Sequence, residues 1–425
     1  MTWFLLKGLL RDRSRSLFPL LVTSAGVLLT VFMYSFIEGE MADMVTNNAN
    51  FQTGHVKVVT RAYAEQLERT PNDLALLEVG ELQHQLSDQF PEIAWVPRIH
   101  FGGLLDIPDE SGETRAQGPA AGMAADLLHP ASGEIDRMQL RDGLVSGRLP
   151  EKPFEILVSD EFAQSLDLQI GKSATLISSG MYGGMAMQNF EVVGTVHFGI
   201  QALDRGGIIA DISGIRRTLN MEDGAGELLG FFKDGQYEEK RADAVVQKFE
   251  QLYSSPEGEF APTILKLTDQ NDLGSMYAYV DVVSSLMVGI FVLVMSIVLW
   301  NAGLMGTLRR YGEYGVRLAI GEEKSHIYRT MIMESLLIGL IGSVVGTALG
   351  LAASYYLQAH GIDIGNLMGS STILFPDVVR AKVTTASYYV GFFPGLLATT
   401  LGSMIAGIGI YKRETASLFK ELEVQ

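Results

Sequence analysis

Few residues of this 425-residue chain have the spacing of a catalytic or ligand-binding motif. Gly171-Lys172-Ser173 has the residues that end a phosphate-binding loop, but that loop needs a glycine five positions before Gly171, where Leu166 stands. The seven histidines are scattered, and none forms the i,i+4 pair of a zinc-binding helix. We therefore expect no catalytic residue, no metal and no other cofactor in this chain.

A short basic stretch, 309–321, lies between two apolar runs and is the most distinctive polar segment. Its positive charges alone would suffice as a signal for membrane topology. Topology does not require Glu313 or the glycines, however, and a charged amphipathic turn with small residues suits docking into a groove of another protein. The candidate docking residues are Arg310, Glu313, Gly315, Arg317, Ala319 and Gly321.

The charge of the chain is unevenly distributed. The net charge is −17 although 47% of the residues are hydrophobic. Residues 38–275 carry about −20 and the remainder about +3, so an acidic hydrophilic segment is flanked by apolar sequence. Such a surface repels phosphates, which argues against a nucleic-acid partner. Cysteine is absent, which excludes disulfides and cysteine-based zinc sites.

Four apolar runs predict transmembrane helices over 17–37, 276–305, 329–357 and 386–411. The first has 21 residues without a charge, and at about 1.5 Å per residue it reaches roughly 31 Å, enough to cross the bilayer core. It is longer than the apolar part of a signal peptide, so we interpret it as a retained anchor.

Basic residues define the orientation of these four helices. They gather in 1–16, in 306–328 and at the start of 412–425, which all lie on one side if there are four spans. That side is cytoplasmic by the positive-inside rule. The large segment 38–275 and the short loop 358–385 are then expected outside the membrane.

The outer segment shows mixed periodicity and predicts an α+β domain, with room for two subdomains. Strands are predicted at His55–Val59, Glu155–Val158 and Phe190–Val196. Leu82, Leu86 and Phe90 share one helical face, as do Val245, Val246, Phe249, Leu252 and Tyr253, and Ser159 is a candidate N-cap for a short helix through Leu166. Loops are expected at 102–118, 180–184 and 221–227.

The third span contains two further features. Glu334 lies about one turn inside it, close enough to the cytoplasmic end for a structural contact with the basic loop. Gly342, Gly346 and Gly350 recur every four residues and form a stripe that allows another helix to approach closely. The sequence leaves open whether that helix belongs to the same chain or to a second one.

The order of one span, a large outer domain and three more spans resembles the FtsX-like permeases of the MacB and lipoprotein-releasing (LolC/LolE) type, the type VII ABC transporters. The segment 310–321, followed by Ile327 and Met333-Glu334, is similar to the family pattern "ER-x-x-EIG-x-x-RALGA … I … EG". Weaker similarities lie at Leu6–Arg11, at Gly54–Val58 and from Gly147-Arg148-Leu149-Pro150 to Gly171. Tyr314 stands where the family usually has isoleucine, and the tail 411–416 lacks the family's prolines.

This resemblance implies that the segment 311–325 is a coupling helix seated in a separate ABC ATPase subunit, which would bind ATP and Mg²⁺. It also implies pairing with a second copy or a homologous permease, mechanotransmission to the outer domain, and a bacterial inner membrane as the location. A periplasmic carrier or adaptor and membrane lipid are further expected partners. Lipoprotein, peptide and small hydrophobic molecules all fit as cargo.

Another class of function is also consistent with the residues. The chain would then be a membrane-anchored sensor or scaffold, or a regulator of a cell-wall hydrolase, whose outer domain binds a ligand or partner without transport. A stand-alone enzyme has little support, because no catalytic constellation is present.

Overall fold

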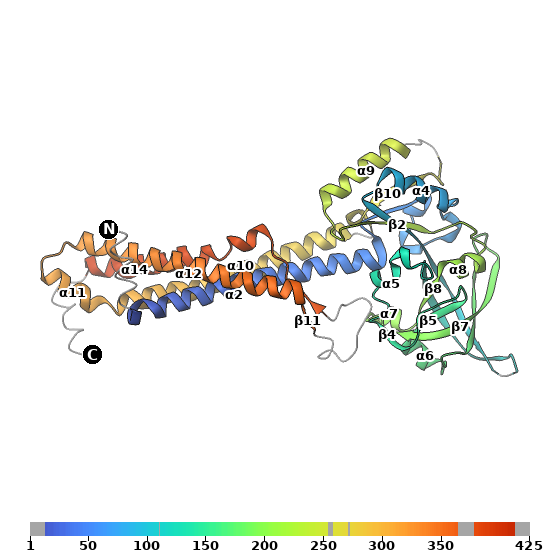
Figure 1. Ribbon diagram of the computed structural model, residues 1–425, viewed down its shortest axis with the longest axis horizontal. Helices are drawn as coiled ribbons and strands as arrows, with labels where there is room; N and C mark the ends of the chain where they lie inside the picture. Colours follow the sequence, from blue (N-terminus) through green and yellow to red (C-terminus); the bar gives the residue numbers. More distant parts are fainter. Residues whose placement is uncertain (1–12, 110, 254–257, 271–272, 364–377, 413–425) are drawn as a thin grey trace. The chain divides into compact units, whose positions relative to one another are not determined.

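The computed structural model describes residues 13–109, 111–253, 258–270, 273–363 and 378–412 (Figure 1). The chain divides into two compact units. The helical unit comprises the described parts of 1–42, 279–362 and 379–425, and the α+β unit comprises those of 43–278 and 363–378.

Four helical segments are long and apolar enough to cross a membrane. Three are continuous: α2 (Arg13–Asn48), α10 (Leu273–Leu308) and α12 (Lys324–His360). The fourth consists of η6 (Thr385–Tyr388), the π-helical η7 (Phe393–Ala398) and α14 (Thr399–Lys412). Each of the four predicted spans lies inside one of these segments. Pro394 stands in the first turn of the π-helical segment, where a missing N–H costs no hydrogen bond within the helix.

The glycine stripe of α12 lies against α2 of the same chain. A Cβ added at Gly342 would lie 2.7 Å from Thr23, and one at Gly346 would lie 2.5 Å from the Ser24 carbonyl oxygen. At Gly350 the nearest atom would be the Val31 Cβ, at 2.9 Å. These distances are shorter than ordinary van der Waals contact, so only glycine permits this approach of the two helices.

Ten strands and seven α-helices are described in the α+β unit. The strands are β1 (Val56–Thr60), β2 (Ile93–Pro108), β3 (Thr114–Ala125), β4 (Leu144–Gly147), β5 (Glu155–Ser159), β6 (Ser173–Ser179), β7 (Met185–Val196), β8 (Gly207–Asp211), β9 (Glu227–Phe232) and β10 (Pro262–Lys266). The helices are α3 (Arg61–Ala64), α4 (Val79–Gln89), α5 (Glu134–Arg137), α6 (Asp160–Ser165), α7 (Gln201–Asp204), α8 (Ile212–Thr218) and α9 (Glu239–Tyr253). A π-helical turn, η1 (Ala49–Thr53), precedes β1, and β11 (Ile362–Asp363) pairs with β12 (Val378–Val379).

Strand β2 belongs to two parts of the sheet. Its first half pairs with β9, and β9, β1 and β10 follow in that order. Its second half pairs with β3 and with β6. Because β3, β8, β5, β7 and β6 pair successively, these strands and β2 close a ring of six. Helices α4 and α9 lie near the β2–β10 part in Figure 1.

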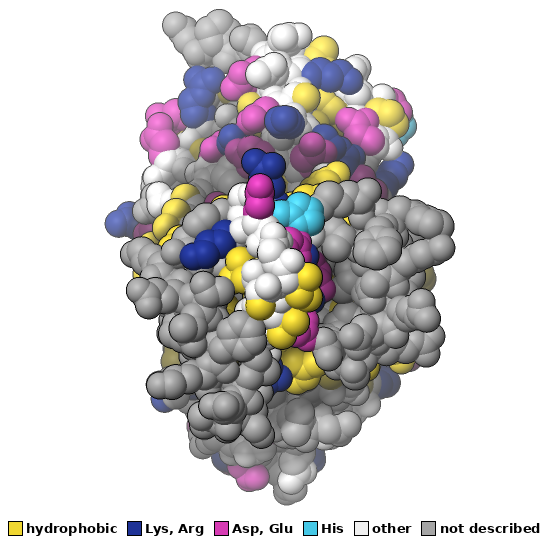
Figure 2. Space-filling model, turned by 90° about the vertical axis from the view of Figure 1, so that its left-hand side faces the viewer, with side chains coloured by type: hydrophobic (Ala, Val, Ile, Leu, Met, Phe, Trp, Pro, Cys, Tyr) yellow, Lys and Arg dark blue, Asp and Glu magenta, His cyan; other side chains and the backbone are white. Residues whose placement is uncertain are grey.

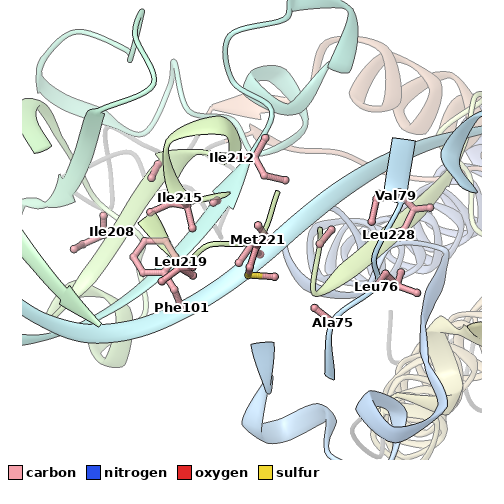
Figure 3. Packing of buried hydrophobic residues seen from close by; sticks show 14 of the residues in the cluster. Ala75, Leu76, Val79, Phe101, Ile208, Ile212, Ile215, Leu219, Met221 and Leu228 are labelled. Atoms are coloured by element: carbon pink, nitrogen blue, oxygen red, sulfur yellow. The ribbon is translucent and has the colours of Figure 1, made fainter. Parts of the chain in front are cut away.

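A single large hydrophobic core connects the two parts of the sheet. Figure 3 shows side chains from α8 and β8 beside residues from β2, β9 and the start of α4. Ile215, Leu219 and Met221 are fully buried in it. Every residue of β1, β5, β8 and β9 is buried, which accounts for their continuous runs of apolar residues.

The predicted strands are present, but the loop expected over 102–118 is wrong. Most of that segment belongs to the long hairpin of β2 and β3. Two glycines of the hairpin allow close approach of neighbouring atoms: a Cβ at Gly103 would lie 2.2 Å from the Ile177 carbonyl oxygen, and one at Gly122 would meet the Phe101 ring. Ser159 does occupy the N-cap position of α6, yet its hydroxyl donates to the Asp204 carbonyl oxygen instead of capping the helix.

The segment from Gly147 to Glu155 is held by a bidentate ion pair. Arg148 Nη1 and Nη2 each donate to one carboxylate oxygen of Glu155, both at 2.7 Å. These hydrogen bonds lower the pKa of the buried Glu155 to about 2. Gly147 has φ +85°, and a Cβ there would lie 2.2 Å from the Val193 carbonyl oxygen. The Gly-Arg-x-Pro…Glu-Ile pattern is therefore explained by packing and charge pairing.

Replacement of Gly346 by leucine tests the close approach of α12 and α2. We expect Gly346→Leu to destabilise the helical unit by about 1–3 kcal/mol, the usual range for overpacking. Gly289 in α10 has no atom within 4 Å of an added Cβ, so Gly289→Leu is the matched control. The stability of both variants is measured as the midpoint temperature at which the protein in detergent ceases to be monodisperse. Equal midpoints for the two variants would contradict the assignment.

Replacement of Glu155 by glutamine tests the ion pair through its pH dependence. The folded pKa lies below the ordinary 4.5, so the stabilisation is complete above pH 4.5 and is lost as the pH falls towards 2. Glu155→Gln should unfold about 2 kcal/mol more easily at pH 7 and lose this acid dependence. Circular dichroism melts between pH 7 and 3 measure this difference in stability. Glu151→Gln, at an exposed position, is the control.

Candidate functional site

The basic stretch between the second and third spans folds as the short helix α11 (Tyr311–Ala319). Tyr311 and Tyr314 are buried and pack against Ile327 and Met331 of α12. The Tyr311 hydroxyl also donates a hydrogen bond to the Ala406 carbonyl oxygen of α14. Burial raises the pKa of Tyr314 to about 12, so its phenol remains neutral. One face of α11 is therefore fixed to the spans that follow it.

The first turn of α11 is held by charge. Arg310 Nη1 lies 2.6 Å from Glu334 Oε2, and Arg310 Nε lies 3.5 Å from Glu313 Oε2. Both side chains of the shorter pair are more than two-thirds buried, which favours a stronger interaction than that of a fully solvated pair. Glu334 thus joins α12 to the start of α11.

The turn after α11 is held by a second charged group. Gly321 has φ +98°, a left-handed conformation that glycine adopts without strain. Arg317 donates to both carboxylate oxygens of Glu322, at 2.6 and 2.5 Å, and His326 Nδ1 lies 2.5 Å from the same carboxylate. The hydrogen bonds from Arg317, and then that from His326, lower the pKa of Glu322. The carboxylate thereby fixes the angle at which the chain enters α12.

The opposite face of α11 is exposed and partly apolar. Val316 is 44% exposed and Ile320 is 81% exposed, and Ala319 is exposed between them. Figure 2 views this end of the helical unit, where hydrophobic side chains lie next to acidic side chains and a histidine. Contiguous exposed apolar residues with a charged rim are typical of a protein-docking surface.

The site residues predicted from the sequence fall into two groups. Arg310, Glu313 and Arg317 are half-buried and make contacts within the chain, and Gly315 is buried. Only Ala319 and Gly321 are exposed.

Sequence reasoning missed Val316 and Ile320, which form the exposed apolar face. The helical spacing contained the signal: Tyr311, Tyr314, Gly315 and Leu318 follow i, i+3, i+4 and i+7, which leaves Val316 and Ile320 on the other side.

The described parts of the chain offer few other candidate metal-binding or phosphate-binding groups. Within them, no group of three His, Cys, Asp or Glu side chains lies in an arrangement that could hold a metal ion. Gly171-Lys172-Ser173 forms a turn that leads into β6, whereas a phosphate-binding loop leads into a helix.

Comparison with known proteins finds similar sequences for the region that contains α11. Residues 285–415 match the FtsX-like permease C-terminal domain. The lipoprotein-releasing system transmembrane protein LolC of Haemophilus influenzae is 21% identical over 287 residues, 64% of this chain and 65% of LolC. The macrolide export ATP-binding/permease protein MacB of Rhodopseudomonas palustris is 32% identical over 135 residues, 31% of this chain and 18% of MacB. The matches therefore span just under two thirds of LolC and under a fifth of MacB.

Among solved structures, the periplasmic region of MacB from Actinobacillus actinomycetemcomitans aligns with 52% of this chain and 92% of that one. The identity is 12% and the TM-score is 0.36, which is too low to establish a shared fold. The relationship to known proteins therefore rests on the sequence matches. In sequence, residues 285–415 are similar to the FtsX-like permease C-terminal domain, and LolC and MacB are homologues of this chain over the segments that match.

Proposed function

We propose that this chain is the permease subunit of an ATP-driven transporter and that α11 docks into a separate ATPase subunit. The exposed face of Val316, Ala319 and Ile320, on a helix otherwise fixed to α12, carries the proposal. ATP and Mg²⁺ are then bound by the ATPase, which hydrolyses the ATP, and this chain takes no part in that reaction.

The contacts of α11 suggest how motion is passed on. A displacement of the helix acts on α12 through the Arg310–Glu334 ion pair and through the packing of Tyr314. It acts on α14 through the hydrogen bond of the Tyr311 hydroxyl to the Ala406 carbonyl oxygen. The glycine stripe of α12 then couples to α2, whose chain continues towards β1 of the α+β unit. This is a route for mechanotransmission without a pore.

The remaining expectations belong to the same proposal. The basic segments 1–16, 306–328 and 412–425 lie in the cytoplasm, the α+β unit lies outside a bacterial inner membrane, and a second permease chain completes the complex. The relatives include a lipoprotein-releasing protein and macrolide exporters. By analogy the cargo is a lipoprotein, a peptide or a small hydrophobic molecule, delivered to a carrier or adaptor outside the membrane.

Replacement of Ile320 by glutamate tests the docking surface. Because Ile320 is 81% exposed, Ile320→Glu should leave the fold intact but introduce a charge into an apolar contact. We expect at least a tenfold loss of cargo-dependent ATP hydrolysis by the complex reconstituted in liposomes. Met185→Glu, at an equally exposed position of the α+β unit, is the control. Unchanged hydrolysis by Ile320→Glu would reject α11 as the docking element and favour the sensor or scaffold function.

Replacement of Glu334 tests the link from α11 to α12. Glu334→Gln removes the charge that Arg310 contacts, and we expect ATP hydrolysis to continue while transport falls several-fold. The double variant Arg310→Glu/Glu334→Arg reverses the pair and should recover part of the transport. The ratio of cargo moved to ATP hydrolysed measures this. A ratio that stays at the wild-type value in Glu334→Gln would rule out the link.

A further inference from the structure

The end of α2 is held inside the α+β unit by one buried arginine. After α2 the chain turns through η1 and enters β1, and the last carbonyl groups of a helix have no partner within it. Arg98 of β2 supplies two of the donors they need: Nη1 donates to the Phe51 carbonyl oxygen and Nη2 to the Asn50 carbonyl oxygen, both at 2.7 Å. Arg98 is fully buried, so bulk water does not compete for these hydrogen bonds.

Arg98 is itself fixed by a carboxylate. Its Nε donates to Glu134 Oε2 of α5 at 2.7 Å, and Glu134 is fully buried as well. Arg137 donates to the other oxygen, Oε1, and its guanidinium lies 4.2 Å from the centre of the Phe231 ring. Each of the three nitrogens of Arg98 thus donates to a different oxygen. A planar guanidinium with all three nitrogens in use fixes the position of η1 relative to β2 and α5.

The charges around η1 favour this arrangement. Arg98 and Arg137 share the single carboxylate of Glu134, which leaves an excess of one positive charge among the three side chains. Arg98 directs this charge at the carbonyl groups that end η1, and the C-terminal end of a helix carries a partial negative charge. Removal of either partner would leave a buried charge without compensation. The cluster therefore resists separation of η1 from the core.

Further contacts hold η1 from other sides. Phe51 packs in a hydrophobic cluster with Phe198, and the two rings meet edge to face at 6.2 Å. The side-chain amide of Gln270, which is fully buried, donates to the Thr53 carbonyl oxygen at 3.2 Å. Gln270 lies shortly before α10, so the segment that follows the first span is bonded to the segment that precedes the second. This junction differs from a flexible linker, which would let the two segments reorient freely.

We propose that Arg98 is a positioning residue that attaches the end of α2 to the core of the α+β unit. The unit then follows a displacement of α2, whereas a flexible connection would absorb part of it. The attachment is a property of this chain alone. Its part in transport rests on the proposed function, because there the displacement of α2 starts at the ATPase.

Spin labels test the attachment, and the absence of cysteine from the chain allows them to be placed at chosen sites. One label is bound at Asn47→Cys of α2 and the other at His84→Cys of α4, both in the α+β unit. The distance between the labels is measured by double electron–electron resonance on the full-length chain in phosphatidylcholine nanodiscs. We expect a narrow distance distribution in the wild type. Arg98→Lys keeps the charge but loses the three-way geometry, and it should at least double the width.

Two variants separate the attachment from general stability. Glu155→Gln removes a buried carboxylate of the same unit that lies outside this cluster, and its distance distribution should match that of the wild type. Glu134→Gln keeps the shape of the side chain but removes its charge, and it should broaden the distribution as Arg98→Lys does. This second variant keeps the test decisive if Arg98→Lys fails to fold.

Another label pair tests transmission in the complex with the ATPase. Tyr356→Cys of α12, at a position that is 67% exposed, is combined with His84→Cys. The non-hydrolysable analogue AMP-PNP should shift the distance between these labels in the wild-type complex. Arg98→Lys should lose at least half of this shift while the complex still hydrolyses ATP. Failure to recover an ATPase would reject the proposed function, and the first label pair would still decide the attachment.

Three results would overturn the proposal. The first is a distance distribution between Asn47 and His84 that is as broad in the wild type as in folded Arg98→Lys. The second is equal broadening by Arg98→Lys and Glu155→Gln, which would assign Arg98 to general stability alone. The third is an undiminished AMP-PNP shift in Arg98→Lys, which would exclude Arg98 from the transmission of α2 movement.

Discussion

The attachment of α11 to α12 is the interaction on which the proposed coupling depends. Two buried tyrosines and the Arg310–Glu334 ion pair fix one face of a nine-residue helix, although a helix of that length is not stable alone in water. Because this face is committed to the chain itself, the opposite face is available to a partner. A short helix held in this way can transmit a force, whereas a flexible loop would absorb it.

The α+β unit is held together by a shared hydrophobic core and by buried ion pairs. Its long strand β2 joins a six-stranded ring to a second sheet part, so both share one core without disulfides. Two ion pairs with both partners buried lie along this junction: Lys57 with Glu227, and Arg98 with Glu134 at 2.7 Å. Such pairs favour one arrangement over others more than they add stability.

Sequence patterns predicted the four spans, because length and apolarity alone identify them. They also predicted strands such as β5 and the position of α11. They failed where tertiary packing decides: Gly102 and Gly103 indicated a loop, but both pair with β3, and Gly103 also packs closely against β6. The charged residues of α11 were expected to face a partner, yet several of them brace the helix. The hydrogen bonds of Arg98 join residues between 36 and 48 positions apart in the sequence, and no local pattern reveals them.

The proposed docking of α11 requires that this chain form a complex with a separate ATPase. The most direct test is affinity purification of the tagged full-length chain in mild detergent, followed by mass spectrometry of the proteins that co-elute. We expect an ATPase with a phosphate-binding loop to co-elute in equal amount to the permease chains and to be lost from the Ile320→Glu variant. Monodisperse protein that elutes without any such ATPase would contradict the proposed docking.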